Sequence, residues 1–126
     1  MRRFTKHFAV PELACNDGTP VPPKYYNNAV LICGRAEVLR AKMGPLHVNS
    51  GYRTPSYNKR VGGATASKHL TCSALDLRSV MGVWTGPELA AAYRLLIEEG
   101  ALPDGGVGEY AGFVHIDLGR SRRWWG

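Results

Sequence analysis

Residues 105–118 read GGVGEYAGFVHIDL, and this stretch gives the clearest indication of the fold class. Its two halves, 105–110 and 113–118, predict strands, and the Ala-Gly pair between them is typical of a turn. Side chains alternate between the faces of a strand, so His115 and Asp117 share one face, while the valine and isoleucine beside them share the other. The stretch therefore predicts two paired strands, the second with one polar and one apolar face.

Two helices are predicted before this pair of strands. Residues 24–43 carry apolar side chains at helical spacing, and the Gly-Pro pair that follows them supplies a stop. A second helix is expected to begin at the capping box formed by Thr85 and Glu88 and to end at Gly100. Both helices need an apolar partner surface, which the strands provide.

Two further short strands are predicted over residues 46–49 and 74–77. Between them, residues 50–73 are rich in Gly, Ser, Thr and Asn and show no periodicity, which predicts a long loop. Long loops inside a small domain are usually functional. The expected fold class is α+β, with two main helices packed on one small, mainly antiparallel sheet.

The composition fits a single domain over residues 1–126. Hydrophobic residues make up 44% of the chain and charged residues 21%, as in ordinary globular proteins. A chain of this length buries roughly two-thirds of its unfolded surface, so it needs no disulfide or metal merely to fold. Three cysteines without a CxxC pair predict reduced thiols.

The net charge of +6 favours an anionic partner, such as nucleic acid, an acidic membrane surface or a cell wall. The basic tail, residues 119–126, contains two tryptophans that could stack on nucleic acid bases, hold an anionic surface, or pack onto the domain. The basic N-terminus is not followed by the apolar core of a signal peptide, so synthesis in the cytoplasm is expected.

Two of the four histidines have neighbours that suit metal chemistry. His69 ends a polar stretch, Asp76 follows seven residues later on a predicted strand, and His115 lies on another strand. Two imidazoles and one carboxylate are the ligand set of many catalytic zinc sites, with water in the fourth position. Spacing alone leaves partly buried, hydrogen-bonded histidines as the alternative, and His7 and His47 fit structural or surface positions.

A longer pattern surrounds these residues. Ser67-x-His69 is followed by Asp76 and by His115 in a Val-His-Ile-Asp strand, and residues 48–58, VNSGYRTPSYN, precede them. This pattern resembles the zinc D-alanyl-D-alanine carboxypeptidase/dipeptidase family, whose zinc site is shared with the hedgehog signalling domain. The resemblance extends over nearly the whole chain.

The resemblance implies a role for each of five residues. His69, Asp76 and His115 would bind Zn²⁺, Arg53 would bind a carboxylate of the substrate, and Ser67 would support a ligand or the substrate. Bidentate geometry is the physical reason for arginine rather than lysine at such a position. The alternatives are a surface salt bridge for Arg53 and an ordinary turn residue for Ser67.

One departure from the family pattern concerns Cys72, three residues after the first expected ligand, where the family usually has glycine. A thiolate binds zinc readily, so Cys72 is a further candidate ligand. The alternative is a small buried residue in the place of the glycine.

The general base is the least determined role. Family members place a glutamate three residues before the last ligand or a histidine two before it, and Gly112 and Phe113 stand there instead. Glu109 has the same offset as a glutamate of the hedgehog domain, and Asp117 shares a strand face with the last ligand. His47 is a third candidate.

The resemblance implies a hedgehog/D,D-peptidase-like fold and zinc-dependent hydrolysis of peptide bonds in bacterial peptidoglycan. Together with the positive charge and the lack of a signal peptide or wall-binding domain, it favours a phage-type endolysin that acts on the cell wall after release. The expected partners are peptidoglycan stem peptides, without nucleic acid, and a monomer is expected. L-alanyl-D-glutamate, D-alanyl-D-alanine and cross-link bonds all remain open. The alternative is a catalytically silent, zinc-containing module that binds the cell wall.

Overall fold

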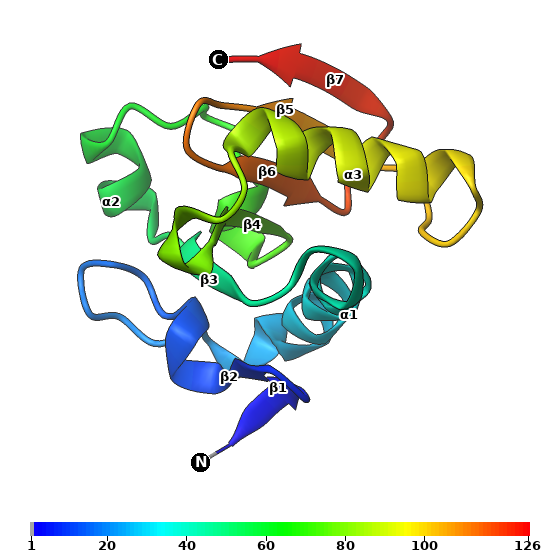
Figure 1. Cartoon of the computed structure of the whole chain (residues 1–126). Coiled ribbons are helices and arrows are strands. Elements are labelled where there is room, and N and C mark those ends of the chain that lie inside the picture. Colours follow the sequence, from blue (N-terminus) through cyan, green and yellow to red (C-terminus); the bar gives the residue numbers. More distant parts are fainter. Residues whose placement is uncertain (1) are drawn as a thin grey trace.

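A five-stranded mixed sheet forms the centre of the computed structural model, which describes residues 2–126 (Figure 1). Its strands, in the order in which they lie side by side, are β3 (Leu46–Ser50), β4 (Ala74–Ser79), β6 (Val114–Asp117), β5 (Gly106–Glu109) and β7 (Arg122–Trp125). Neighbouring strands are antiparallel except for β5 and β7, which are parallel. The expected α+β class and mainly antiparallel sheet are confirmed.

Two long helices pack against the sheet and against each other, α1 (Tyr26–Met43) and α3 (Gly86–Glu98). The first ends where Gly44 adopts a φ of +86°, a conformation that favours glycine. The second begins at the predicted capping box, in which the Thr85 hydroxyl accepts the Glu88 amide and the Glu88 carboxylate accepts the Thr85 amide. Both predicted helices are confirmed.

The prediction of an unstructured loop over residues 50–73 is wrong in part, because this segment contains two short helices. In α2 (Pro55–Arg60), proline occupies the first turn and the Thr54 hydroxyl accepts the Tyr57 amide. The second is the 3₁₀ helix η3 (Lys68–Thr71). Elements of four to six residues are too short to show a helical period, so only their caps reveal them.

The N-terminal segment forms a separate two-stranded sheet of β1 (Arg3–Thr5) and β2 (Phe8–Ala9), followed by the 3₁₀ helix η1 (Val10–Leu13). It contacts α1, and the Glu37 carboxylate accepts both the His7 amide and a His7 ring nitrogen at 2.7 Å. A third 3₁₀ helix, η2 (Pro23–Tyr25), leads into α1, and a fourth, η4 (Val80–Gly82), follows β4.

The apolar face of the sheet and the two long helices enclose the core. Its fully buried members include Ile32, Leu39, Leu75, Leu77, Leu89, Val107, Val114 and Ile116. All three cysteines are buried and unpaired. No helix within residues 2–126 is long and apolar enough to cross a membrane. Because the core occupies one face of β6, the polar residues of that strand are directed to the other face.

Candidate metal centre and active-site cavity

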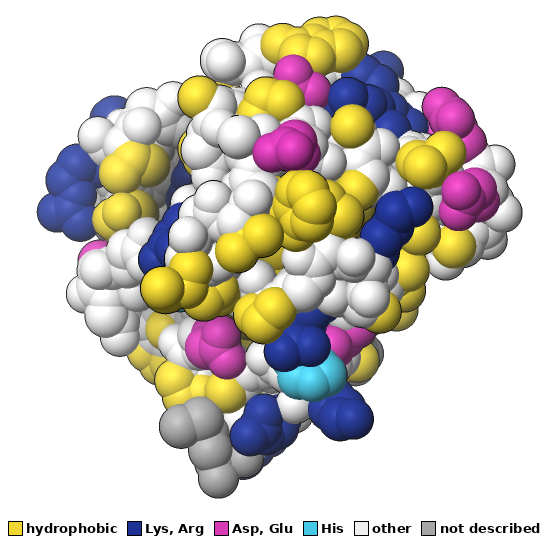
Figure 2. Space-filling model, in the orientation of Figure 1, with side chains coloured by type: hydrophobic (Ala, Val, Ile, Leu, Met, Phe, Trp, Pro, Cys, Tyr) yellow, Lys and Arg dark blue, Asp and Glu magenta, His cyan; other side chains and the backbone are white. Residues whose placement is uncertain are grey.

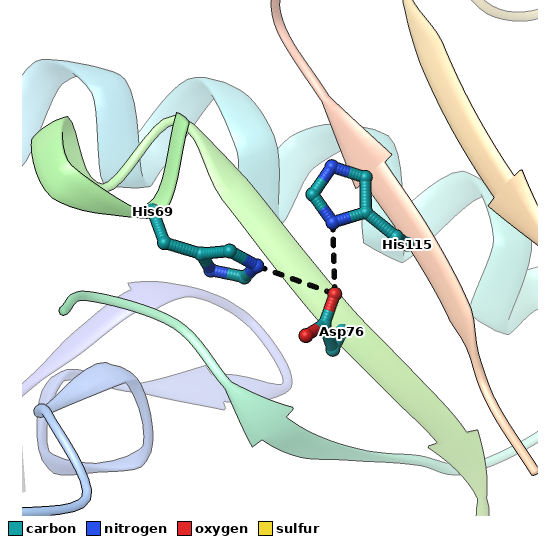
Figure 3. Close-up of side chains that lie close together, drawn as sticks. All are labelled: His69, Asp76 and His115. Carbon is teal, nitrogen blue, oxygen red and sulfur yellow. Dashed lines mark hydrogen bonds and ion pairs between the residues drawn. The ribbon is translucent and has the colours of Figure 1, made fainter. Parts of the chain in front are cut away.

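His69, Asp76 and His115, called the triad below, converge on the polar face of the sheet (Figure 3). Asp76 of β4 is the direct antiparallel partner of His115 of β6, and His69 reaches them from η3. The Asp76 Oδ1 atom lies 2.9 Å from His115 Nδ1 and 3.3 Å from His69 Nε2. One candidate ligand atom from each residue lies within 4.8 Å of the other two.

The remote nitrogen of each imidazole has an acceptor that fixes its tautomer. His69 Nδ1 lies 2.7 Å from the Gly51 carbonyl oxygen, and His115 Nε2 lies 2.8 Å from Asp117 Oδ2. Each ring therefore donates its N–H away from the triad and directs the lone pair of its other nitrogen toward Asp76. Two lone pairs facing a carboxylate require a cation or added protons between them.

This donor set fits zinc. Imidazole nitrogen and carboxylate oxygen are ordinary zinc ligands, and three protein ligands with a free fourth position are typical of catalytic zinc sites. His69 and Asp76 are only 2% and 7% exposed, so the triad is largely shielded from solvent. Burial raises the pKa of Asp76, but its close contacts with the two imidazoles outweigh this effect and hold that pKa below its ordinary value. Asp76 is therefore ionised, as a ligand must be.

Asp117 lies behind His115 and has no free acceptor position. Its side chain is fully buried, and its Oδ1 accepts the backbone amides of Gly106 at 3.2 Å and Gly119 at 2.8 Å. Its Oδ2 accepts His115 Nε2 and Arg122 Nη2, the latter at 2.7 Å. Burial raises its pKa, but these donors lower it to about 2. Such a weakly basic, fully bonded carboxylate orients His115 and is poorly suited to accept a proton from water.

Arg53 lies in the wall of the cavity, with its side chain only 17% exposed. Its Nη2 is 3.4 Å from Asp76 Oδ2, its Nε donates to the Ser50 hydroxyl at 3.1 Å, and its Nη1 donates to the Asn58 side-chain oxygen at 3.2 Å. The Asn58 amide in turn donates to the Ala64 carbonyl. Arg53 is thus held beside the triad by a network that sequence reasoning did not include.

Ser67 and Cys72 flank the segment that carries His69. The Ser67 hydroxyl accepts the His69 amide at 3.2 Å and caps η3, so it supports a triad residue through the backbone. Cys72 is fully buried and has a φ of +54°, the left-handed conformation that favours glycine. Within residues 2–126, the group of side chains that could hold a metal ion consists of the triad and does not include the Cys72 thiol.

Glu109 is not brought to the triad. It pairs with Val114 in the sheet, and Gly108 pairs with His115, so alternation places the Glu109 side chain on the face opposite the triad. There its Oε1 accepts Arg94 Nη2 of α3 at 3.1 Å. The base role expected for Glu109 therefore has no support in the geometry, because its offset from His115 leaves its side chain on the other face of the sheet.

His47, the third candidate base, lies on an exposed position of β3 and does not line the cavity. The triad lies in a cavity of about 820 Å³. Within the described residues, Asp76 and Asp117 are the two acidic residues lining it, and both already have partners.

The strand β7, which lies in the basic tail, forms one wall of this cavity. The sequence alone did not decide between three roles for that tail. The Trp124 ring lies 5.0 Å from the His115 ring between centroids, and its indole N–H donates to the Tyr110 hydroxyl at 2.9 Å. Glycine at position 108 makes room for it, since a Cβ there would lie 2.5 Å from the indole. Arg122 covers the same ring at 5.0 Å. Of the three roles considered for the tail, packing onto the domain is the one observed.

A protein-family model described as Peptidase M15 matches residues 5–117 of the chain. The match covers most of the sequence and includes the whole triad, and it ends just before β7. No curated protein matches the chain. The family expected from the sequence pattern is therefore confirmed.

Proposed function

The chain belongs to the M15 family of zinc-dependent peptidases, and we propose that it hydrolyses peptide bonds in the stem peptides of bacterial peptidoglycan. Zinc is the cofactor of the family, and the triad of His69, Asp76 and His115 is the candidate site for it. The observation that carries the proposal is the convergence of two imidazole lone pairs and an ionised carboxylate in a basic cavity.

The residues around the triad have distinct proposed roles. A zinc ion in such a site supplies Lewis-acid activation of the scissile carbonyl and of the attacking water. Arg53 donates hydrogen bonds to a carboxylate of the substrate, and Asp117 keeps the proton on His115 Nε2 and so holds that ring in place. The Tyr110 oxygen accepts the Trp124 indole N–H and Tyr110 lines the cavity, so its hydroxyl proton is proposed to be available to the substrate.

Glu109 is proposed to support β5 through its ion pair with Arg94 and to take no part in the reaction. Ser67 is proposed to hold η3, and thereby His69, rather than to touch the substrate. These assignments leave the chemistry to groups that line the cavity.

We also propose an endolysin-type role, the lysis of the cell wall. The net charge of +6 suits an anionic wall, and Lys and Arg gather on the outer side of the lobe at the left of Figure 2, where α2 lies. Membrane-permeabilised bacteria treated with the zinc-loaded protein should lose turbidity. An unchanged turbidity, with purified peptidoglycan still cleaved, would exclude the lytic role alone.

A catalytically silent zinc module that binds the cell wall is the second candidate, because both carboxylates lining the cavity already have partners. Mass spectrometry of purified peptidoglycan incubated with the zinc-loaded protein separates the two functions. If the protein is a peptidase, new peptide termini should appear, and their position identifies the bond that is cleaved. Sedimentation of the protein with intact peptidoglycan, without new termini, would support the silent module.

A further inference from the structure

A second group of cations lies on the side of the triad away from Arg53. We call Lys68, Arg120 and Arg122 the cationic rim; all three line the cavity. Close polar contacts of 2.7–3.4 Å connect Arg53 to Asp76, Asp76 to His115, His115 to Asp117, and Asp117 to Arg122. Arg53 and Arg122 therefore lie at opposite ends of a path of contacts that passes through Asp76 and His115.

Two members of the cationic rim converge above Gly119. A Cβ built on Gly119 would lie 3.0 Å from Lys68 Cε and 3.3 Å from Arg122 Nη2. Arg122 is fixed there, because it bonds to the buried Asp117 carboxylate at 2.7 Å and lies over the Trp124 ring. The long Lys68 side chain thus brings its ammonium group close to a guanidinium whose position is already set.

Within the described chain, the charge of the cationic rim is neutralised only at Arg122, through its ion pair with Asp117. Asp117 is the only carboxylate bonded to it, and Asp117 also accepts His115. Within residues 2–126, neither Lys68 nor Arg120 forms an ion pair. Like charges held near one another repel, and an anion between them relieves the repulsion.

We propose that the cationic rim is a second carboxylate-binding subsite, and that the protein selects peptides carrying a free carboxylate on each side of the scissile bond. Arg53 receives one carboxylate and the cationic rim receives the other. This inference rests on the proposed peptidase function and adds the substrate class. Conversion of the second carboxylate to a primary amide removes the charge and keeps the size, so an amidated peptide binds less well.

The test uses two synthetic stem-type peptides that differ only in this group, a free carboxylate or its primary amide. Zinc-loaded wild type should favour the free acid by about tenfold or more in kcat/KM and in the Kd measured by calorimetry. The double variant Lys68→Gln/Arg120→Gln should lose this preference. The control Lys42→Gln/Arg78→Gln, which also removes one lysine and one arginine charge but at exposed positions outside the cavity, should keep it. Arg122 is left unchanged because it supports Asp117.

Equal Kd and kcat/KM for the two peptides in the wild type would overturn the subsite, as would a preference that persists in the double variant. If neither peptide is cleaved, the peptidase proposal fails, and the calorimetric comparison still decides the subsite. A wild-type preference in Kd that the double variant loses then supports it without catalysis.

Discussion

The two histidines of the triad are held in different ways. His69 lies on a short 3₁₀ helix, and its remote nitrogen donates to a backbone carbonyl, that of Gly51. His115 lies on a central strand, and its remote nitrogen donates to the side chain of Asp117. A backbone carbonyl remains in place when the side chain of its residue is substituted. A side-chain partner, in contrast, is removed by a single substitution. The His115 half of the site is therefore the half that side-chain substitution can tune.

The largest effect, loss of the bound zinc, is expected for substitution of either histidine. His69→Ala and His115→Ala each remove one of the three proposed ligands and should each lose most of the bound zinc, as measured by metal analysis of the purified variants. Retention of one zinc per chain in both variants, with loss in Cys72→Ser, would show that the ligand set is different.

Asp117→Asn should separate the two halves. The amide can no longer act as a charged acceptor for His115, so zinc affinity should fall by roughly 10–100-fold. Competition with a chromophoric chelator measures this affinity, and circular dichroism checks that the variant is folded. No side-chain substitution removes the partner of His69, since that partner is a main-chain oxygen. An unchanged affinity would mean that Asp117 does not support the site.

Arg53→Lys should affect the substrate and leave the metal in place. An ammonium cannot reproduce the planar, two-pronged donor, so kcat/KM should fall by about tenfold or more while zinc content and folding stay unchanged. Lys42→Arg, the reverse exchange on an exposed helix end, is the matched control. Wild-type kcat/KM in Arg53→Lys would remove its proposed role in binding a carboxylate.

Substitution of Cys72 tests whether the backbone conformation of the segment that carries His69 is strained. Cys72→Gly and Cys72→Ala both remove the buried thiol. Only alanine keeps a Cβ atom, which strains the backbone at a φ of +54°. The glycine variant should therefore unfold with a free energy about 1 kcal/mol higher than the alanine variant. Chemical denaturation measures the difference, and full zinc content in both would confirm that the thiol is not a ligand. A more stable alanine variant would contradict the strain argument.

The smallest effect is expected at Glu109. Glu109→Gln weakens a partly exposed ion pair with Arg94, so stability should fall by less than about 1 kcal/mol, with zinc content and kcat close to wild type. Steady-state kinetics with the cleaved peptide measures kcat. A loss of roughly 10²-fold or more would restore the role of general base to Glu109.

The triad and the main elements could be predicted because their signals are local. Alternation along residues 113–118 places His115 and Asp117 on one face, and the capping box of Thr85 and Glu88 marks a helix start. The family pattern then joined three distant residues into one site. Each of these signals is carried by a few neighbouring residues and needs no knowledge of strand pairing.

The supporting groups could not be predicted, because they depend on register and on tertiary contacts. Glu109 is one residue away from the face of the triad, a difference that only the pairing of Gly108 with His115 decides. The strand β7 is four residues long and pairs with a strand that does not adjoin it in sequence, so nothing local reveals that Trp124 reaches His115. Asn58 reaches Arg53 from a helix of six residues.

The fixed orientation of the two imidazole lone pairs links folding to the metal supply. An unfolded chain does not hold these two nitrogens and the Asp76 carboxylate together, so zinc at the proposed site would bind the folded protein preferentially. By mass action, free zinc at about 100 times its Kd raises the free energy of unfolding by about 2.7 kcal/mol. The melting temperature of the protein therefore reports the concentration of free zinc around it, and chelation lowers its resistance to heat before any residue is changed.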